Sequence, residues 1–237
     1  MIILHDKRLP AEYKKALSDN LHDTFFVSFE GIPGKVYESI SSHPDIYMFQ
    51  LDEKTVVHAP GVPEEKIKEL REGGIELVMG EEDPHGRYPQ TARYNAARVG
   101  DFVFGNLEYT DPTIIKEACD RGLKCMNVEQ GYTRCSLLAV SDNALITADR
   151  SIAQVAKNEG LEVLFISSGS VFLPGERYGF IGGAGGRIED KVILLGSIDT
   201  HPDSEEIKDF ITHNSGKVIS LARKPLYDAG SIMCFFA

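Results

Sequence analysis

Residues 55–79 read TVVHAPGVPEEKIKELREGGIELVM, and this stretch shows the pattern that decides the fold. It opens with an apolar, β-branched run at Thr55–His58, which is typical of a strand. The spacing of apolar residues predicts a helix over Pro63–Glu72, which Gly73-Gly74 ends. A second strand follows at once at Ile75–Met79. The stretch therefore predicts a strand, a helix and a second strand in immediate succession.

The same order recurs along the chain. A third strand and a short acidic turn complete each copy, and a period of roughly 40 to 55 residues is typical of propeller and solenoid repeats. The five copies open at Met1–Leu4, Thr55–His58, Phe102–Phe104, Ala144–Thr147 and Val192–Leu195. Their second strands are predicted at Thr24–Phe29, Ile75–Met79, Leu123–Val128, Leu161–Ile166 and Lys217–Leu221.

Short polar turns connect the copies. Turns such as Gly100-Asp101 and Glu189-Asp190 are typical of β-hairpins, so the third strand of one unit is expected to pair antiparallel with the first strand of the next. Doubly wound α/β units, the alternative, need longer crossover connections. The final strand, Ser231–Phe236, is expected to pair with Met1–Leu4, which closes a ring and removes exposed sheet edges.

The predicted fold class is thus α/β, with five ββαβ repeats around a pseudo-fivefold axis. We expect one domain over residues 1–237, with a central pocket lined by the third strands. The predicted units are 1–50, 51–99, 100–141, 142–189 and 190–237.

Composition limits the class of partner. The 237 residues carry a formal net charge of −11, and the pI is near 5.1, which argues against nucleic acid and against an anionic membrane surface. No segment reaches the roughly 20 apolar residues of a membrane span. The four cysteines show no metal-ligand spacing, so reduced thiols, no metal and no cofactor are expected. A cytoplasmic protein with a small-molecule ligand is the predicted class.

Two stretches carry candidate chemistry. Asp228-Ala229-Gly230-Ser231-Ile232-Met233-Cys234 brings small residues before a cysteine, and the predicted inner strand Ser42–Phe49 contains His43 and Asp45. Together with the five-unit ring, these stretches resemble the pentein, or α/β-propeller, superfamily. It includes arginine and agmatine deiminases, dimethylarginine hydrolase and amidinotransferases, and a ribosome anti-association factor uses the fold without catalysis.

The resemblance implies roles for these residues. Cys234 would be the nucleophile whose thiolate attacks a guanidinium carbon. Asp45 would hold the planar cation, because a carboxylate is its natural bidentate partner. His43 is the second candidate catalytic residue, because it would place an imidazole near the ring axis, where it, Tyr132 or Arg134 would tune the thiol. From residue type alone, Cys234 is equally consistent with a buried apolar residue.

The sequence also departs from the family. Where an acid is expected in a Glu-Gly-Gly-Asp-like stretch, this chain has Ala92-Arg93-Tyr94-Asn95-Ala96. Where the general-base histidine is expected, it has Tyr132-Thr133-Arg134-Cys135-Ser136. Arg93, Asn95, Tyr132 and Arg134 are therefore candidate substrate-binding residues. On neighbouring inner strands, the two arginines would form an anion clamp or pair with acids.

Two hypotheses follow. The first is a diverged guanidine- or amidine-handling pentein, a Cys-dependent hydrolase or amidinotransferase acting on a small guanidino or amino-acid-like substrate. The second is a non-catalytic pentein that binds a small molecule or a protein. Catalysis by Cys234 requires an acid or an imidazole within about 3 to 4 Å of its sulfur.

Overall fold

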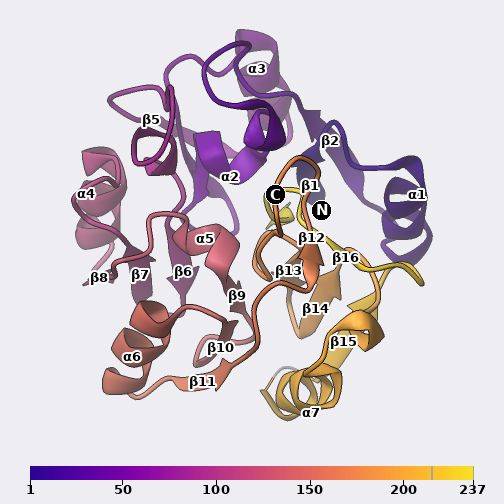
Figure 1. Cartoon of the computed structure of the whole chain (residues 1–237). Helices are drawn as coiled ribbons and strands as arrows, with labels where there is room; N and C mark the ends of the chain where they lie inside the picture. The colour runs from indigo at the N-terminus through magenta and orange to yellow at the C-terminus, as the bar shows by residue number, and fades with distance from the viewer. Residues whose placement is uncertain (215, 237) are drawn as a thin grey trace.

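The structure is a computed structural model that describes residues 1–214 and 216–236. Within these ranges, no helix is both long and apolar enough to cross a membrane. The fold is mixed α/β, and Figure 1 shows five helices at the outside of the molecule, with the sheets inside them. These helices are α1 (Ala11–Asn20), α3 (Glu64–Glu72), α4 (Pro112–Asp120), α6 (Arg150–Asn158) and α7 (Ser204–Asn214).

The described strands form five three-stranded sheets with a common plan and one two-stranded sheet. In each larger sheet the middle strand pairs parallel with the strand after the helix, and antiparallel with an inner strand. This is the pairing that the repeat predicts. The sheets are β17–β1–β2 (Met233–Phe235, Ile2–Asp6, Phe25–Phe29), β3–β4–β5 (Met48–Gln50, Thr55–His58, Glu76–Met79), β6–β7–β8 (Ala97–Val99, Phe102–Gly105, Lys124–Asn127), β9–β10–β11 (Leu137–Ala139, Ala144–Thr147, Glu162–Phe165) and β13–β14–β15 (Gly185–Ile188, Lys191–Leu194, Lys217–Ser220).

Local signals explain the outer helices. Asp111 caps α4 by accepting a hydrogen bond from the Thr113 N–H at 3.0 Å, and Asp149 caps α6 by accepting one from the Ile152 N–H at 3.0 Å. Pro112 occupies the first turn of α4, where its missing N–H costs nothing. Gly122 follows α4 with φ +74°, a conformation that glycine adopts without strain.

The first and last strands pair as predicted. β1 and β17 run antiparallel, with Ile3 opposite Cys234 and Leu4 opposite Met233. The two chain ends accordingly lie near each other in Figure 1. The predicted closure of the first and last units on each other is confirmed.

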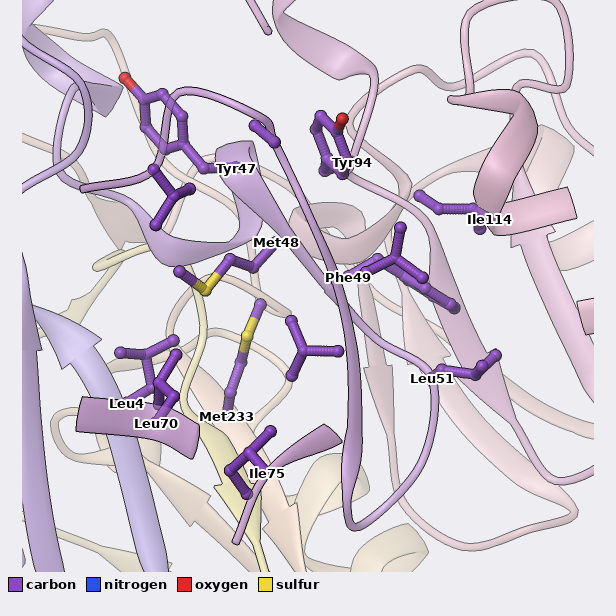
Figure 2. Close-up of a cluster of buried hydrophobic side chains, with 14 of the residues drawn as sticks. Leu4, Tyr47, Met48, Phe49, Leu51, Leu70, Ile75, Tyr94, Ile114 and Met233 are labelled. Atoms are coloured by element: carbon purple, nitrogen blue, oxygen red, sulfur yellow. The ribbon is translucent and has the colours of Figure 1, made fainter. Parts of the chain in front are cut away.

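A large hydrophobic cluster joins several elements, and Figure 2 shows part of it. Leu4 of β1, Phe49 of β3, Leu70 of α3, Ile114 of α4 and Met233 of β17 belong to it, and none is more than 1% exposed. Burial of this apolar surface therefore ties the closing strand β17 to the first three sheets.

Two inner strands begin later in the chain than predicted, because a short helix precedes each of them. Within Ser42–Phe49, Pro44–Tyr47 forms the short helix α2, and the strand β3 starts only at Met48. In the same way, Thr133–Ser136 forms the helix α5 before β9. A 3₁₀ turn, η2 (Gln90–Ala92), precedes β6. The cause is local, because Pro44 fits the first turn of a helix and a short apolar run does not distinguish helix from strand.

Further short elements complete the fold. β12 (Val171–Phe172) pairs parallel with β16 (Leu226–Tyr227), a contact that the sequence pattern does not predict. It holds the segment before β13 against the segment before β17. The remaining 3₁₀ turns of the described residues are η1 (Glu38–Ile40) and η3 (Ile198–Thr200).

The pairing of β17 with β1 generates a stability prediction. Phe235→Ala in the closing strand should lower the free energy of unfolding by about 3–5 kcal/mol, because Phe235 is fully buried in the large cluster. Phe165→Ala, at an aromatic side chain that is 46% exposed, should cost at most about 1 kcal/mol. Urea unfolding of both variants measures the difference. Equal, small losses would mean that β17 does not belong to the cooperative core.

Candidate functional site

The short helices α2 and α5 and the turn η2 each precede an inner strand, and their polar residues meet in the interior. Asp45 is the second residue of α2, and its side chain is fully buried. Cys135 lies in α5, Asn95 follows η2, and Ser231 comes just before β17, all at most 4% exposed. We call Asp45, Asn95, Cys135 and Ser231 the central cluster.

Asp45 is the acceptor at the middle of this cluster. Its Oδ2 accepts a hydrogen bond from the Ser231 hydroxyl at 2.8 Å and one from the Cys135 thiol at 3.1 Å. Its Oδ1 is buried and has no hydrogen-bond donor among the described residues. A buried acceptor without a donor is costly, so this oxygen is a candidate position for a donor from a ligand.

Asn95 fixes the geometry of the cluster. Its Nδ2 donates to the backbone oxygen of Asp45 at 3.1 Å and to the sulfur of Cys135 at 3.2 Å. Its Oδ1 accepts from the backbone N–H of Cys135 at 3.1 Å. One amide side chain thereby joins α2 to α5.

An unusual backbone brings Ser231 to the carboxylate. Gly230 and Ser231 have φ values of +65° and +70°, and the Ser231 N–H donates to the Gly183 oxygen at 3.0 Å. A Cβ on Gly230 would come within 2.2 Å of the Cβ of His43, so glycine is required there. The left-handed conformation is strained for serine and is held by these contacts.

Burial disfavours the charged forms of the ionisable groups in the cluster. Burial raises the pKa of Asp45, although its hydrogen bonds from Cys135 and Ser231 oppose this change. Burial raises the pKa of the Cys135 thiol well above its usual range, and the charges of Asp45 and Asp228 raise it further. Cys135 is therefore a thiol that donates to Asp45, not a thiolate.

A second layer of ionisable groups lies behind the cluster. Burial, followed by the charge of Asp45, raises the pKa of Asp228 to about 7. Burial, followed by the charge of Arg8, lowers the pKa of His43 to about 3, so this imidazole is neutral near pH 7. His43 Nε2 lies 3.7 Å from Asp6 Oδ2, and its Nδ1 lies 3.9 Å from Asp228 Oδ1. A neutral imidazole at these distances forms no ion pair with either acid.

A cavity of about 1000 Å³ lies along the inner strands. Residues of β3, β6, β9, β13 and β17 line it, as the sequence predicts for the central pocket, together with residues of the turns that follow them. Arg134 and Cys234 line this cavity, whereas the four residues of the central cluster do not. The candidate residues thus divide between a buried cluster and a cavity.

Comparison with protein families gives one match that spans most of the chain. Residues 4–233 match the "Family of unknown function (DUF6873)". The chain belongs to this family. A comparison with curated protein sequences finds no match.

Solved structures show which fold the DUF6873 chain has. DDAH from Pseudomonas aeruginosa, a mutant complexed with citrulline, is 12% identical, with a TM-score of 0.57 and coverage of 93% of this chain and 91% of that one. The amidinotransferase SxtG from Microseira wollei is 10% identical, with a TM-score of 0.51 and coverage of 93% and 88%. The N-terminal domain of ArgZ, a cyanobacterial arginine dihydrolase, is 12% identical, with a TM-score of 0.55 and coverage of 93% and 90%. All are pentein-superfamily proteins, so the predicted resemblance is confirmed, and at these identities it concerns the fold.

Cys234 of this DUF6873 protein has surroundings unlike those predicted. Its backbone oxygen accepts a hydrogen bond from Gln50 at 2.5 Å, and its side chain packs with Ile3 and Ile193 in a hydrophobic cluster. Burial raises the pKa of its thiol to about 12, although the charge of Arg134 opposes this change. Among the described residues, no carboxylate or imidazole forms a hydrogen bond with its sulfur. The catalytic role of Cys234 stays a prediction.

The two candidate arginines do not lie on inner strands. Arg93 follows η2 and forms an ion pair with Glu82, and Arg134 lies in α5 and faces the cavity. The predicted placement on neighbouring inner strands is therefore wrong, because Arg134 lies in a helix and Arg93 in the turn after η2, and for Arg93 the pairing with an acid is the alternative that the structure shows.

Tyr132 belongs to a group of contacting side chains, Tyr37, Tyr88, Thr91 and Tyr132, which we call the cover. The Tyr132 hydroxyl lies 2.8 Å from the Tyr37 hydroxyl and 2.5 Å from the Thr91 hydroxyl. Tyr88 packs against its ring, with centroids 5.5 Å apart. The segments that carry Tyr37, Tyr88 and Thr91 thus meet at Tyr132, three residues before the Cys135 thiol.

Sequence reasoning did not select Cys135, Ser231 or Asp228 as functional residues. All three stand in the stretches quoted above, so the positional signal was present. The motif directed attention to Cys234, four residues after Gly230. The positive φ of Ser231 instead turns the serine hydroxyl toward Asp45.

Asp228 generates a pH prediction. Because its native pKa is about 7 against an ordinary value of 3.8, the folded protein keeps a proton that the unfolded chain releases near pH 4. The contribution of Asp228 to the free energy of unfolding therefore falls as the pH rises from about 4 to about 7, by up to about 1.4 kcal/mol per pH unit. Asp228→Asn cannot ionise and should gain stability relative to the wild type over the same range.

Urea unfolding of Asp228→Asn and the wild type at about pH 4.5 and about pH 8 measures this gain. Asp209→Asn, at an exposed position, is the matched control and should show no comparable pH dependence. A stability difference between Asp228→Asn and wild type that does not change with pH would contradict the buried, protonated Asp228.

Proposed function

We propose that this protein is a guanidine- or amidine-handling pentein in which Asp45 holds the cationic group of a small ligand. Five ββαβ units around one axis would form the ring, consistent with its five similar sheets. The observation that carries the proposal is the Asp45 carboxylate, which is fully buried and has one oxygen without a donor. The fold is shared with DDAH, SxtG and ArgZ. Their names, a dimethylarginine dimethylaminohydrolase, an amidinotransferase and an arginine dihydrolase, refer to guanidine or amidine groups.

A guanidinium or amidinium ion matches this carboxylate. Such ions are planar and present paired N–H donors, which suit two carboxylate oxygens. Binding would supply the donor that Asp45 Oδ1 lacks and would place a positive charge beside the cluster. That charge would lower the pKa of both Asp45 and Cys135 by stabilising their ionised forms.

The thiol of Cys135 is the nucleophile that we assign to the reaction. It lies 3.1 Å from Asp45 Oδ2, so a cation bound to Asp45 would bring its central carbon beside the sulfur. Asp45 accepts the thiol proton, and the sulfur forms a bond to the carbon of the amidine group. The amine then leaves with a proton, and water hydrolyses the resulting thiouronium-type intermediate, or a second amine accepts the amidino group.

Access to Asp45 requires movement of the cover. The central cluster is closed in this structure, and the hydroxyl contacts of Tyr132 with Tyr37 and Thr91 hold covering segments together. Arg8 adds a second link, because it pairs with Asp6 and donates to the backbone oxygen of Ser39 at 3.0 Å. A ligand would enter when these contacts open.

A second candidate function is binding without chemistry. The high pKa of both Cys135 and Cys234, and the absence of an imidazole hydrogen-bonded to either sulfur among the described residues, favour it. In that case Asp45 would anchor the same cationic ligand, and the thiols would be packing residues.

Alkylation tests the proposal. Chloroacetamidine carries the cationic group and iodoacetamide is its neutral counterpart, and mass spectrometry maps the labelled cysteine. Cys135 should react with chloroacetamidine at least about tenfold faster, relative to free cysteine, than with iodoacetamide. Asp45→Asn should abolish this preference, whereas Asp209→Asn at an exposed site should keep it.

The other outcomes are equally informative. Selective labelling of Cys234 would overturn the assignment of Cys135 and support the nucleophile that the motif implies. Labelling of neither cysteine before unfolding would overturn the catalytic proposal. If acetamidine still stabilises the native protein in an Asp45-dependent way, the binding function holds in its place.

A further inference from the structure

The cavity of about 1000 Å³ is a second feature, separate from the central cluster. It reaches from the inner strands to the hairpin turns, and exposed turn residues such as Glu53 and Asp101 line its mouth. Arg134, from α5 at the other end of β9, lines the same cavity. Arg134 therefore lies between the cavity and the central cluster.

Arg134 has most of its hydrogen-bonding capacity unused. Its guanidinium makes one long hydrogen bond, from Nη1 to the backbone oxygen of Leu137 at 3.4 Å. It forms no ion pair with any described residue, and the charge of Asp45 acts on it only from beyond ion-pair distance. The guanidinium has five N–H donors and is always charged, so at a half-buried position this arrangement calls for an anion.

The other three arginines of the cavity already have partners, and Arg121 pairs with Glu117 at 2.6 Å and with Asp52 at 3.6 Å. Arg98 donates to the backbone oxygens of Gly100 and Leu51, both at 2.8 Å. Arg187 donates to the Glu189 backbone oxygen at 2.9 Å and pairs with Asp142 at 2.6 Å. These arginines stabilise the turns and add positive charge to the cavity lining. Because their guanidinium groups already have partners, Arg134 is the cavity arginine that can bind an anion.

The mouth of the cavity sets the charge of the ligand. Glu53, Asp101 and Lys54 are exposed there, and none of the three side chains has an ion-paired partner among the described residues, so two carboxylates outweigh one ammonium group. Their negative charge repels a dianion more strongly than a monoanion. A single planar carboxylate also matches the guanidinium with two parallel hydrogen bonds.

We propose that the cavity binds a small monocarboxylate through Arg134. The site differs from the one proposed at Asp45 in position and in ligand charge, because Asp45 lies outside the cavity and would hold a cation.

The test uses acetate and propionate as probes, and sulfate and phosphate at the same ionic strength as comparisons, with isothermal titration and thermal unfolding as readouts. The carboxylates should bind saturably and raise Tm, and they should bind more tightly than phosphate. Arg134→Gln should weaken acetate binding at least about tenfold, and Arg134→Lys should weaken it less, because lysine keeps the charge but loses the bidentate geometry. Arg223→Gln, an exposed substitution with the same charge change, should bind acetate like wild type.

Two further measurements keep the proposal falsifiable if Arg134→Gln does not fold. Ala139→Phe, which fills the cavity from β9, should abolish acetate binding. Acetate binding that persists in Asp45→Asn separates this site from the proposed function. Equal, non-saturating stabilisation by all salts, in wild type and Arg134→Gln alike, would overturn the proposal.

Discussion

The buried carboxylate of Asp45 is the constraint on which the interior of this protein depends. A carboxylate away from water is stable only if donors or protons compensate it, and here the donors come from two distant parts of the chain. The α5 helix turns the Cys135 thiol toward this carboxylate. The left-handed backbone conformation of Ser231 brings the serine hydroxyl to the same oxygen. Asn95 fixes the distance between the two short helices. The departures from regular strand structure at α2 and α5 are therefore the geometry that this one group requires.

The charges around Asp45 are arranged asymmetrically. On one side, Asp228 and Asp45 are buried acids without a direct cationic partner among the described residues, and each has a raised pKa. On the other side, Arg134 forms no ion pair with a described residue, although its charge opposes the rise in the pKa of Asp45. A sequence that optimised stability alone would let these groups pair or would replace them by apolar residues. That they remain apart favours ligands of opposite charge at the two positions, a cation at Asp45 and an anion in the cavity.

The sequence predicted the repeated parts of the fold well, because strand, helix and turn signals in each unit are local. The outer helices, the hairpins and the pairing of β1 with β17 follow from such signals. The short helix at Pro44–Tyr47 and the pairing of β12 with β16 do not, since short apolar runs are ambiguous and the second contact joins distant segments. For the site, Asp45 was selected from the sequence, whereas Cys135 and Ser231 were not. Their side chains reach Asp45 through a helical turn and a positive φ, and neither is visible in residue spacing.

The most direct measurement is the affinity of the native protein for acetamidine, determined by isothermal titration for the wild type and for Asp45→Asn. An interior organised around a cation-binding carboxylate predicts saturable binding to the wild type and a loss of at least about tenfold in the variant, since the charged hydrogen bonds would be removed. Equal affinity in the two proteins, or no binding to a correctly folded wild type, would contradict the role of Asp45 as the anchor.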